Sequence, residues 1–168
     1  FMKKFIITCL IIFCHNFLSD TTLATVSKGK FSCLFIDNFG VETDKGFYLQ
    51  ISPERLDMIE RNSKLRDKNH GHVDIIAFNT WNEGNVSAEL IYSFGIEVIK
   101  NRYYKNRDAA KFPHKFIMDR ETYALNIEDE SSKETLNYQC RKLNNNLSFE
   151  DLILDRISEL QELIDLRS

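Results

Sequence analysis

Proline and glycine are scarce in this sequence: it holds only two prolines and six glycines in 168 residues. Aromatic residues are plentiful by contrast, with thirteen phenylalanines and six tyrosines. Aromatic side chains are enriched in β-strands and suit a hydrophobic core. A hydrophobic content of 43% and a charged content of 28% are ordinary for a folded protein. The composition therefore argues against wholesale disorder and favours one domain with a real core.

The motifs of several enzyme classes are also missing. The sequence has no glycine-rich loop that could cradle a phosphate, no dinucleotide-binding fingerprint and no serine flanked by the glycines of a nucleophile elbow. The acidic groups at Glu128-Asp129-Glu130 and at Asp37, Glu42 and Asp44 lie in segments typical of loops. We therefore expect a protein that is not an enzyme and that needs no cofactor.

The first 24 residues have the layout of a secretory signal peptide. Met2-Lys3-Lys4 is a short basic start, and residues 5–14 form an apolar run too short to cross a bilayer about 30 Å thick. Thr22-Leu23-Ala24 offers small residues at both specificity positions, so we place the cleavage after Ala24. A retained signal anchor is the alternative, and His15-Asn16 disfavours it because these residues interrupt the apolar run. After processing we expect no membrane span.

Cleavage would leave two of the four cysteines, Cys33 and Cys140. An exported chain enters an oxidising compartment, where a disulfide persists. The long separation between the two residues allows about 4–5 kcal/mol of stabilisation in the chain-entropy model. Free thiols, one of them catalytic, are the competing interpretation, but no histidine or second cysteine lies nearby to support a nucleophile. We predict a Cys33–Cys140 disulfide that ties the first and last strands of the domain.

Residues 25–143 carry the alternating pattern of a β-rich domain. Strands are predicted at residues 30–36, 47–51, 72–81, 86–94, 96–104, 115–118, 122–127 and 135–143. Ser52-Pro53-Glu54 has the serine and proline of a helix start, which predicts one short helix over about 53–66. A strand that continues into a charged loop is the alternative there. Seven or eight short strands imply a mainly β fold, a small antiparallel barrel or sandwich.

Residues 144–168 predict an amphipathic C-terminal helix, which makes the fold α+β overall. Ser148 is followed three residues later by Asp151, as in a capping box, and the helix then runs to about Leu166. One apolar seam contains Phe149, Ile153, Ile157, Leu160 and Ile164. Such a seam either packs on the parent domain or pairs with a partner helix, and pairing with another copy would give a homodimer.

Arg102, Tyr103, Tyr104 and Lys105 are the centre of the one basic and aromatic stretch. Charge and ring stacking in such a stretch can bind anionic lipid, phosphate groups or single-stranded nucleic acid. The same pattern is also typical of a solvated hairpin. The formal net charge of −3 becomes −4 when residues 1–24, with two lysines and one aspartate, are removed. A negative chain argues against general nucleic-acid affinity.

His70, His72 and Asp74 form the only cluster that resembles a metal site. His72 and Asp74 would share a strand face, and His70 could reach over Gly71 to complete a three-ligand set. A junction between a turn and a strand, with exposed polar residues, explains the same pattern. We therefore expect no metal, with these three residues as a weak candidate.

The segment Phe116–Leu125, followed by Leu136–Cys140, resembles the C-terminal half of many small secreted proteins of alpha-proteobacteria. Those proteins carry an Asp/Asn-Arg-x-Thr-Gly-x-Leu turn between two strands, then an aromatic residue or glycine before a cysteine that pairs with an early cysteine. Phe31-Ser32-Cys33 fits the same layout. The chain departs from the pattern at Tyr123, where glycine is usual, and in its C-terminal helix. The resemblance supports export and the β-fold and implies no reaction.

These observations lead to one hypothesis and two alternatives. We expect a non-enzymatic binding protein, exported through the secretory pathway to the periplasm or the extracellular space, with an unidentified protein as its partner. An exported effector that acts on a host protein is the narrower version. The expected contact surfaces are Tyr103-Tyr104 with its neighbours and the C-terminal helix. The alternatives are a small hydrolase or metal-dependent enzyme and a self-associating structural envelope protein.

Overall fold

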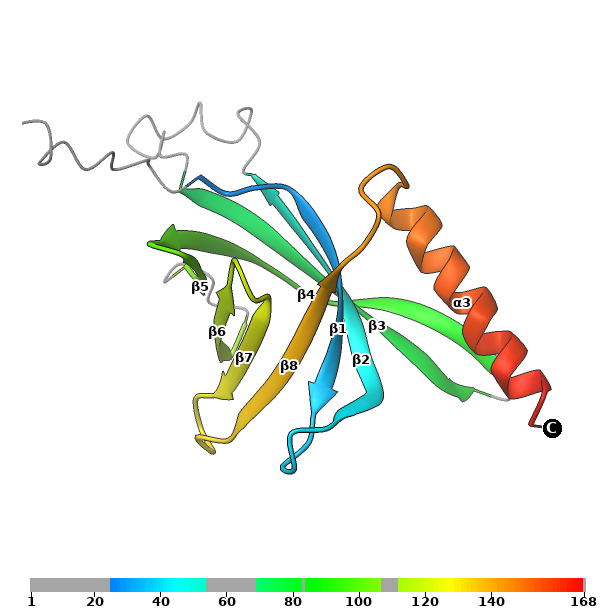
Figure 1. The fold of residues 1–168 in the computed structure, drawn as a ribbon. Helices are drawn as coiled ribbons and strands as arrows, with labels where there is room; N and C mark the ends of the chain where they lie inside the picture. Colours follow the sequence, from blue (N-terminus) through cyan, green and yellow to red (C-terminus); the bar gives the residue numbers. More distant parts are fainter. Residues whose placement is uncertain (1–24, 54–68, 83, 107–111, 168) are drawn as a thin grey trace, which may run out of the picture.

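The computed structural model describes residues 25–53, 69–82, 84–106 and 112–167. Its elements are β1 (Gly29–Ile36), β2 (Glu42–Pro53), β3 (His70–Asn82), β4 (Asn85–Ile99), β5 (Arg102–Lys105), β6 (His114–Asp119), β7 (Ala124–Asp129), β8 (Thr135–Lys142) and α3 (Phe149–Asp165). Each strand pairs antiparallel with the next, and β8 pairs with β1, so the sheet closes into an up-and-down barrel (Figure 1). The predicted mainly β fold with a C-terminal helix is confirmed, and the architecture is the barrel.

Two predicted segments fall largely outside the described residues: the signal peptide, residues 1–24, and the short helix over 53–66. The predicted start of that helix is wrong, because Ser52 and Pro53 still belong to β2, where Pro53 pairs with Gly71. Proline is tolerated at the end of a strand, where its missing N–H interrupts no further ladder bond. The serine and proline that predicted a helix start therefore end a strand.

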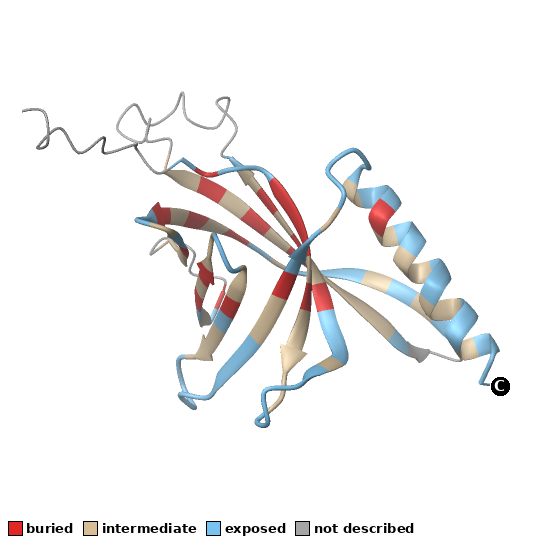
Figure 2. Cartoon of the chain, viewed as in Figure 1, coloured by how far each residue is buried: buried red, intermediate tan, exposed pale blue. Residues whose placement is uncertain are grey.

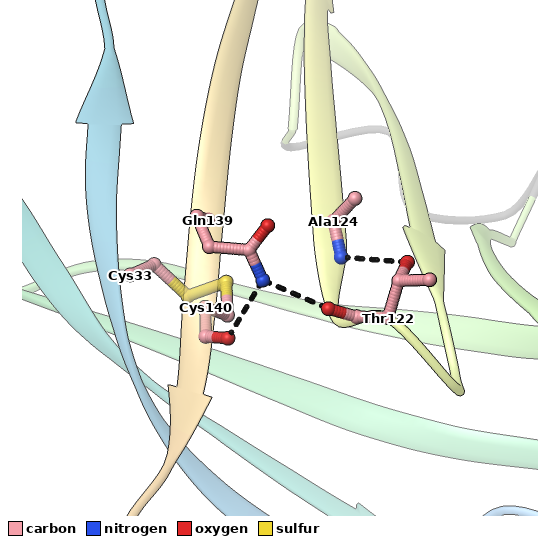
Figure 3. Close-up of a disulfide and its surroundings, with 5 residues drawn as sticks. All are labelled: Cys33, Thr122, Ala124, Gln139 and Cys140. Carbon is pink, nitrogen blue, oxygen red and sulfur yellow. Dashed lines mark hydrogen bonds between the residues drawn. A yellow bond between two sulfur atoms is a disulfide. The ribbon is translucent and has the colours of Figure 1, made fainter. Parts of the chain in front are cut away.

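The predicted disulfide closes the barrel covalently. Cys33 and Cys140 lie directly opposite each other on β1 and β8, with Cα atoms 3.9 Å apart, and both side chains are buried (Figure 3). Beside them, Gln139 Nε2 donates to the carbonyl of Thr122 at 2.8 Å and to that of Cys140 at 3.2 Å. The bond to Thr122 connects β8 to the turn between β6 and β7. The disulfide thus joins the two strands whose pairing completes the sheet.

Inward-facing apolar side chains fill the barrel. Buried and less buried residues alternate along β2, β3 and β4 (Figure 2), as the two-residue period of a strand requires. The fully buried side chains are Phe112, Phe116, Leu49, Ile51, Ile75, Ile96, Met118, Leu125, Val73, Cys33 and Cys140. Phe112 stacks on Phe94 with ring centres 4.2 Å apart, and Phe116 meets the same ring edge-on at 5.4 Å. The many aromatic residues of the sequence, from which we predicted a hydrophobic core, thus contribute to that core.

The residues that precede β1 pack into one end of the barrel. Val26 is buried and belongs to the hydrophobic core. It lies against Gly71, where an added Cβ would come within 2.5 Å of Val26 Cγ1 and 2.7 Å of the Ser52 carbonyl oxygen. The Arg120 guanidinium donates to the carbonyl of Thr25 at 3.0 Å and holds this arm in place. Glycine is therefore required at position 71 because the N-terminal arm crosses it.

The two strands predicted on either side of Gly95 are a single strand. β4 runs through Gly95 to Ile99, and the chain turns at Lys100 and Asn101 instead. Lys100 has a φ of 55°, in the left-handed region that residues other than glycine seldom adopt. Gly95 is ordinary strand backbone, and its carbonyl accepts a hydrogen bond from Asn106 N at 2.9 Å. The glycine therefore marks no break.

β3 and β4 are longer than their neighbours β2 and β5 and extend beyond the wall of the barrel. β2 pairs with β3 only as far as Phe47 opposite Ala77, and β5 pairs with β4 only from Ile96 onwards. Beyond these limits residues 78–82 of β3 pair with residues 85–88 of β4, and residues 89–91 of β4 have no paired neighbour in β5. They form a two-stranded hairpin that projects from the barrel beside α3 (Figure 1), which we call the hairpin extension.

Candidate functional site

The expected basic and aromatic surface is only partly present. Tyr103 is 4% exposed and belongs to the hydrophobic core, because it points inward from β5, where it pairs with Val98 and Met118. Tyr104 is half-buried. Neighbouring residues in a strand point to opposite faces, so the two tyrosines cannot share one surface. The expectation that both are exposed for contact is wrong.

The two basic residues of this stretch are engaged by acidic neighbours. Arg102 Nε lies 3.8 Å from Asp119 Oδ2, and Lys105 Nζ donates to Glu130 Oε1 at 2.9 Å. The hydrogen bond from Lys105 lowers the pKa of the Glu130 carboxyl. Residues 107–111, which continue the predicted stretch, lie outside the described residues. In the described part, the positive charges are balanced and do not form a basic patch.

His72 and Asp74 share the outer face of β3 as predicted, and Ser93 of β4 joins them. Ser93 Oγ lies 2.6 Å from His72 Nε2 and donates to Asp74 Oδ1 at 2.6 Å, while His72 Nε2 is 3.2 Å from the same oxygen. In a hydrolytic triad the histidine stands between serine and carboxylate and uses one nitrogen for each. Here both groups meet one nitrogen, and the serine gives its hydrogen to the carboxylate. This arrangement does not activate the serine.

His70 does not complete a metal site with these residues. Its Nδ1 is buried and accepts or donates no hydrogen bond within the described chain. Over the described residues, no group of three or more histidine, cysteine, aspartate or glutamate side chains is placed to hold a metal ion. The weak candidate formed by His70, His72 and Asp74 is therefore not assembled.

The C-terminal helix is anchored at both ends. At its start, Ser148 and Asp151 form the predicted capping box. Just before it, Lys30 of β1, 6% exposed, donates from Nζ to the carbonyl of Leu147. Near its end, Gln161 Oε1 accepts from Val86 N at 3.1 Å in the hairpin extension. α3 thus runs alongside the hairpin extension, to one side of the barrel (Figure 1).

The charged side chains in the middle of α3 lie within electrostatic reach of Tyr48 on β2. Burial raises the pKa of the Tyr48 hydroxyl. Burial has the largest effect on this pKa, and smaller electrostatic effects come from three charged residues of α3: Arg156, Glu159 and Asp155. The Tyr48 ring also meets Phe78 of β3 edge-on, with ring centres 4.9 Å apart. Tyr48 therefore packs on β3 and lies within electrostatic reach of α3.

The apolar seam of α3 is largely used by the parent domain. The five predicted seam residues are all half-buried: Phe149, Ile153, Ile157, Leu160 and Ile164. Leu152, beside them, is buried and 8% exposed. Other apolar side chains remain in solvent: Leu154, Leu163 and Leu166 on the helix, and Leu90 and Ile91 on the hairpin extension. We call α3 and the hairpin extension together the hairpin–helix platform. A homodimer through α3 stays a prediction.

The negative charge of the chain is concentrated on α3. The helix holds six acidic residues and one basic residue, a formal charge of −5, whereas the whole chain has a net charge of −3. The rest of the chain therefore carries a formal charge of +2. The six acidic side chains are all exposed. The platform consequently offers a partner acidic groups beside exposed leucines.

Comparison with protein-family models, with curated proteins and with solved structures gave no match. No helix in the described part of the chain is long and apolar enough to cross a lipid bilayer. The resemblance to secreted alpha-proteobacterial proteins stays a prediction. The function has to be inferred from the geometry of the molecule.

Sequence reasoning missed two parts of this surface. It predicted strands on either side of residues 82–85, but the projection of the hairpin depends on how far β2 and β5 extend, which local patterns do not report. It also gave no role to Gln161, because a polar residue at the border of an amphipathic helix is ordinary. The position of the β3–β4 hairpin beside the helix gives that side chain its main-chain partners, Val86 N and Gly84 O.

Proposed function

We propose that this chain is an exported, non-enzymatic protein-binding module and that the hairpin–helix platform is its contact surface. The observation that carries the proposal is that this part of the molecule holds exposed apolar side chains: Leu90 is 53%, Leu154 56% and Leu163 47% exposed. Exposed apolar groups rimmed by polar groups are typical of protein contact surfaces. Action as an effector on a host protein is the narrower form of the same proposal.

The construction of the barrel supports a scaffold role. Its interior is packed with side chains, and its closing strands are cross-linked by Cys33–Cys140. A structural disulfide is typical of proteins that function in an oxidising compartment, which supports export. Rigid scaffolds commonly present their contact residues on projecting segments. The hairpin extension and α3 are such projecting parts.

The experiment is affinity capture with the mature chain, residues 25–168, from bacterial envelope and host extracts. A Leu154→Asp/Leu163→Asp variant adds charge at two exposed positions of α3, so the fold should persist by circular dichroism. The matched control is Phe39→Asp, because Phe39 is 90% exposed in the β1–β2 turn, away from α3. The proposal predicts that a captured protein is lost with the double variant and retained with the control.

Two results would overturn the proposal. One is capture that the double variant leaves unchanged. The other is capture that is lost with Phe39→Asp alone, which would move the contact surface to the β1–β2 turn.

A further inference from the structure

The outer edge of β4 carries main-chain groups that face away from β3. Val86 N donates to the side chain of Gln161, and Gly95 O accepts from Asn106 N. The main-chain groups of Val86 and Gly95, near the two ends of this edge, therefore point away from β3. Main-chain groups alternate sides along a strand, and the bulge opposite Ile75 and Ile76 shifts the phase between the two ends. The N–H and C=O groups of Ala88 and Leu90 therefore face outward with those of Val86.

Gln161 contacts this edge as a neighbouring peptide group would. Its Oε1 accepts from Val86 N at 3.1 Å, and its Nε2 donates to the carbonyl of Gly84 at 2.5 Å. A second hydrogen on Nε2 is donated to Asp165 Oδ1 at 3.0 Å. A carboxamide has the same donor and acceptor pair as a peptide unit, so one side chain replaces one unit of a missing strand.

The segment Val86–Leu90 is complementary to itself. If two copies paired antiparallel about Ala88, Val86 would face Leu90 of the second copy, and Ser87 would face its Glu89. All outward-facing groups of the segment would then find partners. A register centred on Glu89 would place two carboxylates opposite each other, which is unfavourable. Of these two registers, the chemistry of the edge favours the one centred on Ala88.

We propose that α3, through Gln161, guards the edge of β4, and that two copies of the chain pair antiparallel through Val86–Leu90 when this contact opens. An unpaired strand edge is a template for another strand, and folded proteins often cover such edges with a helix. The inference rests on the proposed function, because it takes the hairpin–helix platform as the contact surface. It makes a second copy one occupant of that surface.

The test uses the full mature chain with Gln161→Glu. This change keeps the size of the side chain but removes both donated hydrogens and sets a carboxylate against Gly84 O and Asp165. The new carboxylate is repelled by these two oxygens, so the side chain should leave the edge and withdraw the acceptor of Val86 N. At a protein concentration where the chain is monomeric, exchange of the Val86 amide hydrogen should therefore be about tenfold faster. Self-association measured by sedimentation velocity should become about tenfold tighter. Glu162→Gln, at the neighbouring exposed position, is the control and should change neither.

A second substitution tests the pairing itself. Ala88→Pro removes an N–H that faces away from β3, so it spares the β3–β4 ladder but removes the central bond of the dimer. Adding it to Gln161→Glu should return the chain to a monomer. Faster Val86 exchange without self-association would overturn the inference, as would unchanged exchange or a dimer that Ala88→Pro does not affect. Capture of another protein by the Ala88→Pro chain would show that the proposed function holds even so.

Discussion

The turns before and after β7 are built from the same arrangement of residues. In each turn an aspartate, Asp119 or Asp129, accepts from the main-chain N–H groups two and three residues later through Oδ1. A Thr or Ser at the third position then accepts from a later N–H, and a residue with positive φ follows. These residues are Tyr123, with φ 57°, and Lys133, with φ 62°. The pattern Asp-x-x-Ser/Thr thus encodes the turn.

The geometry at Tyr123 bears on the resemblance stated from the sequence. The related pattern has glycine at this position, and the backbone here adopts the left-handed conformation that glycine favours. The tyrosine keeps the conformation and adds a ring that packs 5.2 Å from Phe31. The tyrosine therefore changes the packing of the turn, while the backbone keeps the left-handed conformation that glycine favours.

Asp129 should make stability depend on pH. Hydrogen bonds from the Ser131 side chain and from the N–H groups of Ser132 and Ser131 hold the pKa of Asp129 far below its usual value. A carboxyl whose pKa is lower in the folded state stabilises the fold above its unfolded pKa of about 3.9 and loses that contribution as pH falls further. In urea unfolding, Asp129→Asn should cost stability at pH 7, and the gap to the parent chain should shrink below about pH 4.

A gap between these two chains that stays constant or widens on acidification would contradict this account of Asp129. The measurement needs the disulfide intact in both chains, so that pH acts on the turn and not on the barrel closure.

Gly46 is required by a close main-chain approach. A Cβ at this position would lie 2.2 Å from the Cys33 carbonyl oxygen, an atom held in the β1–β2 ladder. Gly46→Ala should therefore lower the free energy of unfolding by about 3 kcal/mol or more, the upper range of steric overpacking. Gly95→Ala is the control: its Cβ would meet nothing closer than 3.7 Å and should change stability by less than about 0.5 kcal/mol. Equal losses in urea unfolding would contradict this explanation.

At the scale of elements, α3 depends on its first turn. Ser148 accepts from Asp151 N at 2.9 Å, and the Asp151 carboxylate accepts in return from Ser148 N. Ser148→Ala should cost about 1 kcal/mol of helix stability, measured as an earlier loss of helical circular dichroism on heating. Ser158→Ala, at an exposed position in the middle of the helix, should cost nothing, because alanine is the better helix former. A similar loss in both variants would rule out the capping box as the cause.

The sequence predicted elements well where a local pattern decides them. The strand positions follow from alternation of apolar residues, and the helix start follows from Ser148 and Asp151. The break after Ile99 was missed because it lies at Lys100, which carries no glycine or proline signal. This error carried over to Tyr103: without the true start of β5, nothing fixes which of two adjacent tyrosines faces inward.

At the scale of the molecule, the barrel and the platform have different origins. The sequence indicates alternating strands and one disulfide but leaves a barrel and a sandwich open, and the pairing of β8 with β1 makes the sheet a closed barrel. The platform follows from differences in strand length: β3 and β4 have 13 and 15 residues, whereas β5 has four. Excess length cannot stay in the wall, so it projects and needs the cover that α3 supplies.

The central claim is that the closing strands of this barrel are joined inside it by Cys33–Cys140, and the most direct test is disulfide mapping on the mature chain. Denatured without reduction, the chain should show no free thiol, and digestion should give one linked pair of peptides that holds these two cysteines. Reduction should then lower the free energy of unfolding by about 2–5 kcal/mol. Two reactive thiols in the purified, unreduced chain would contradict the covalent closure and the argument for export that rests on it.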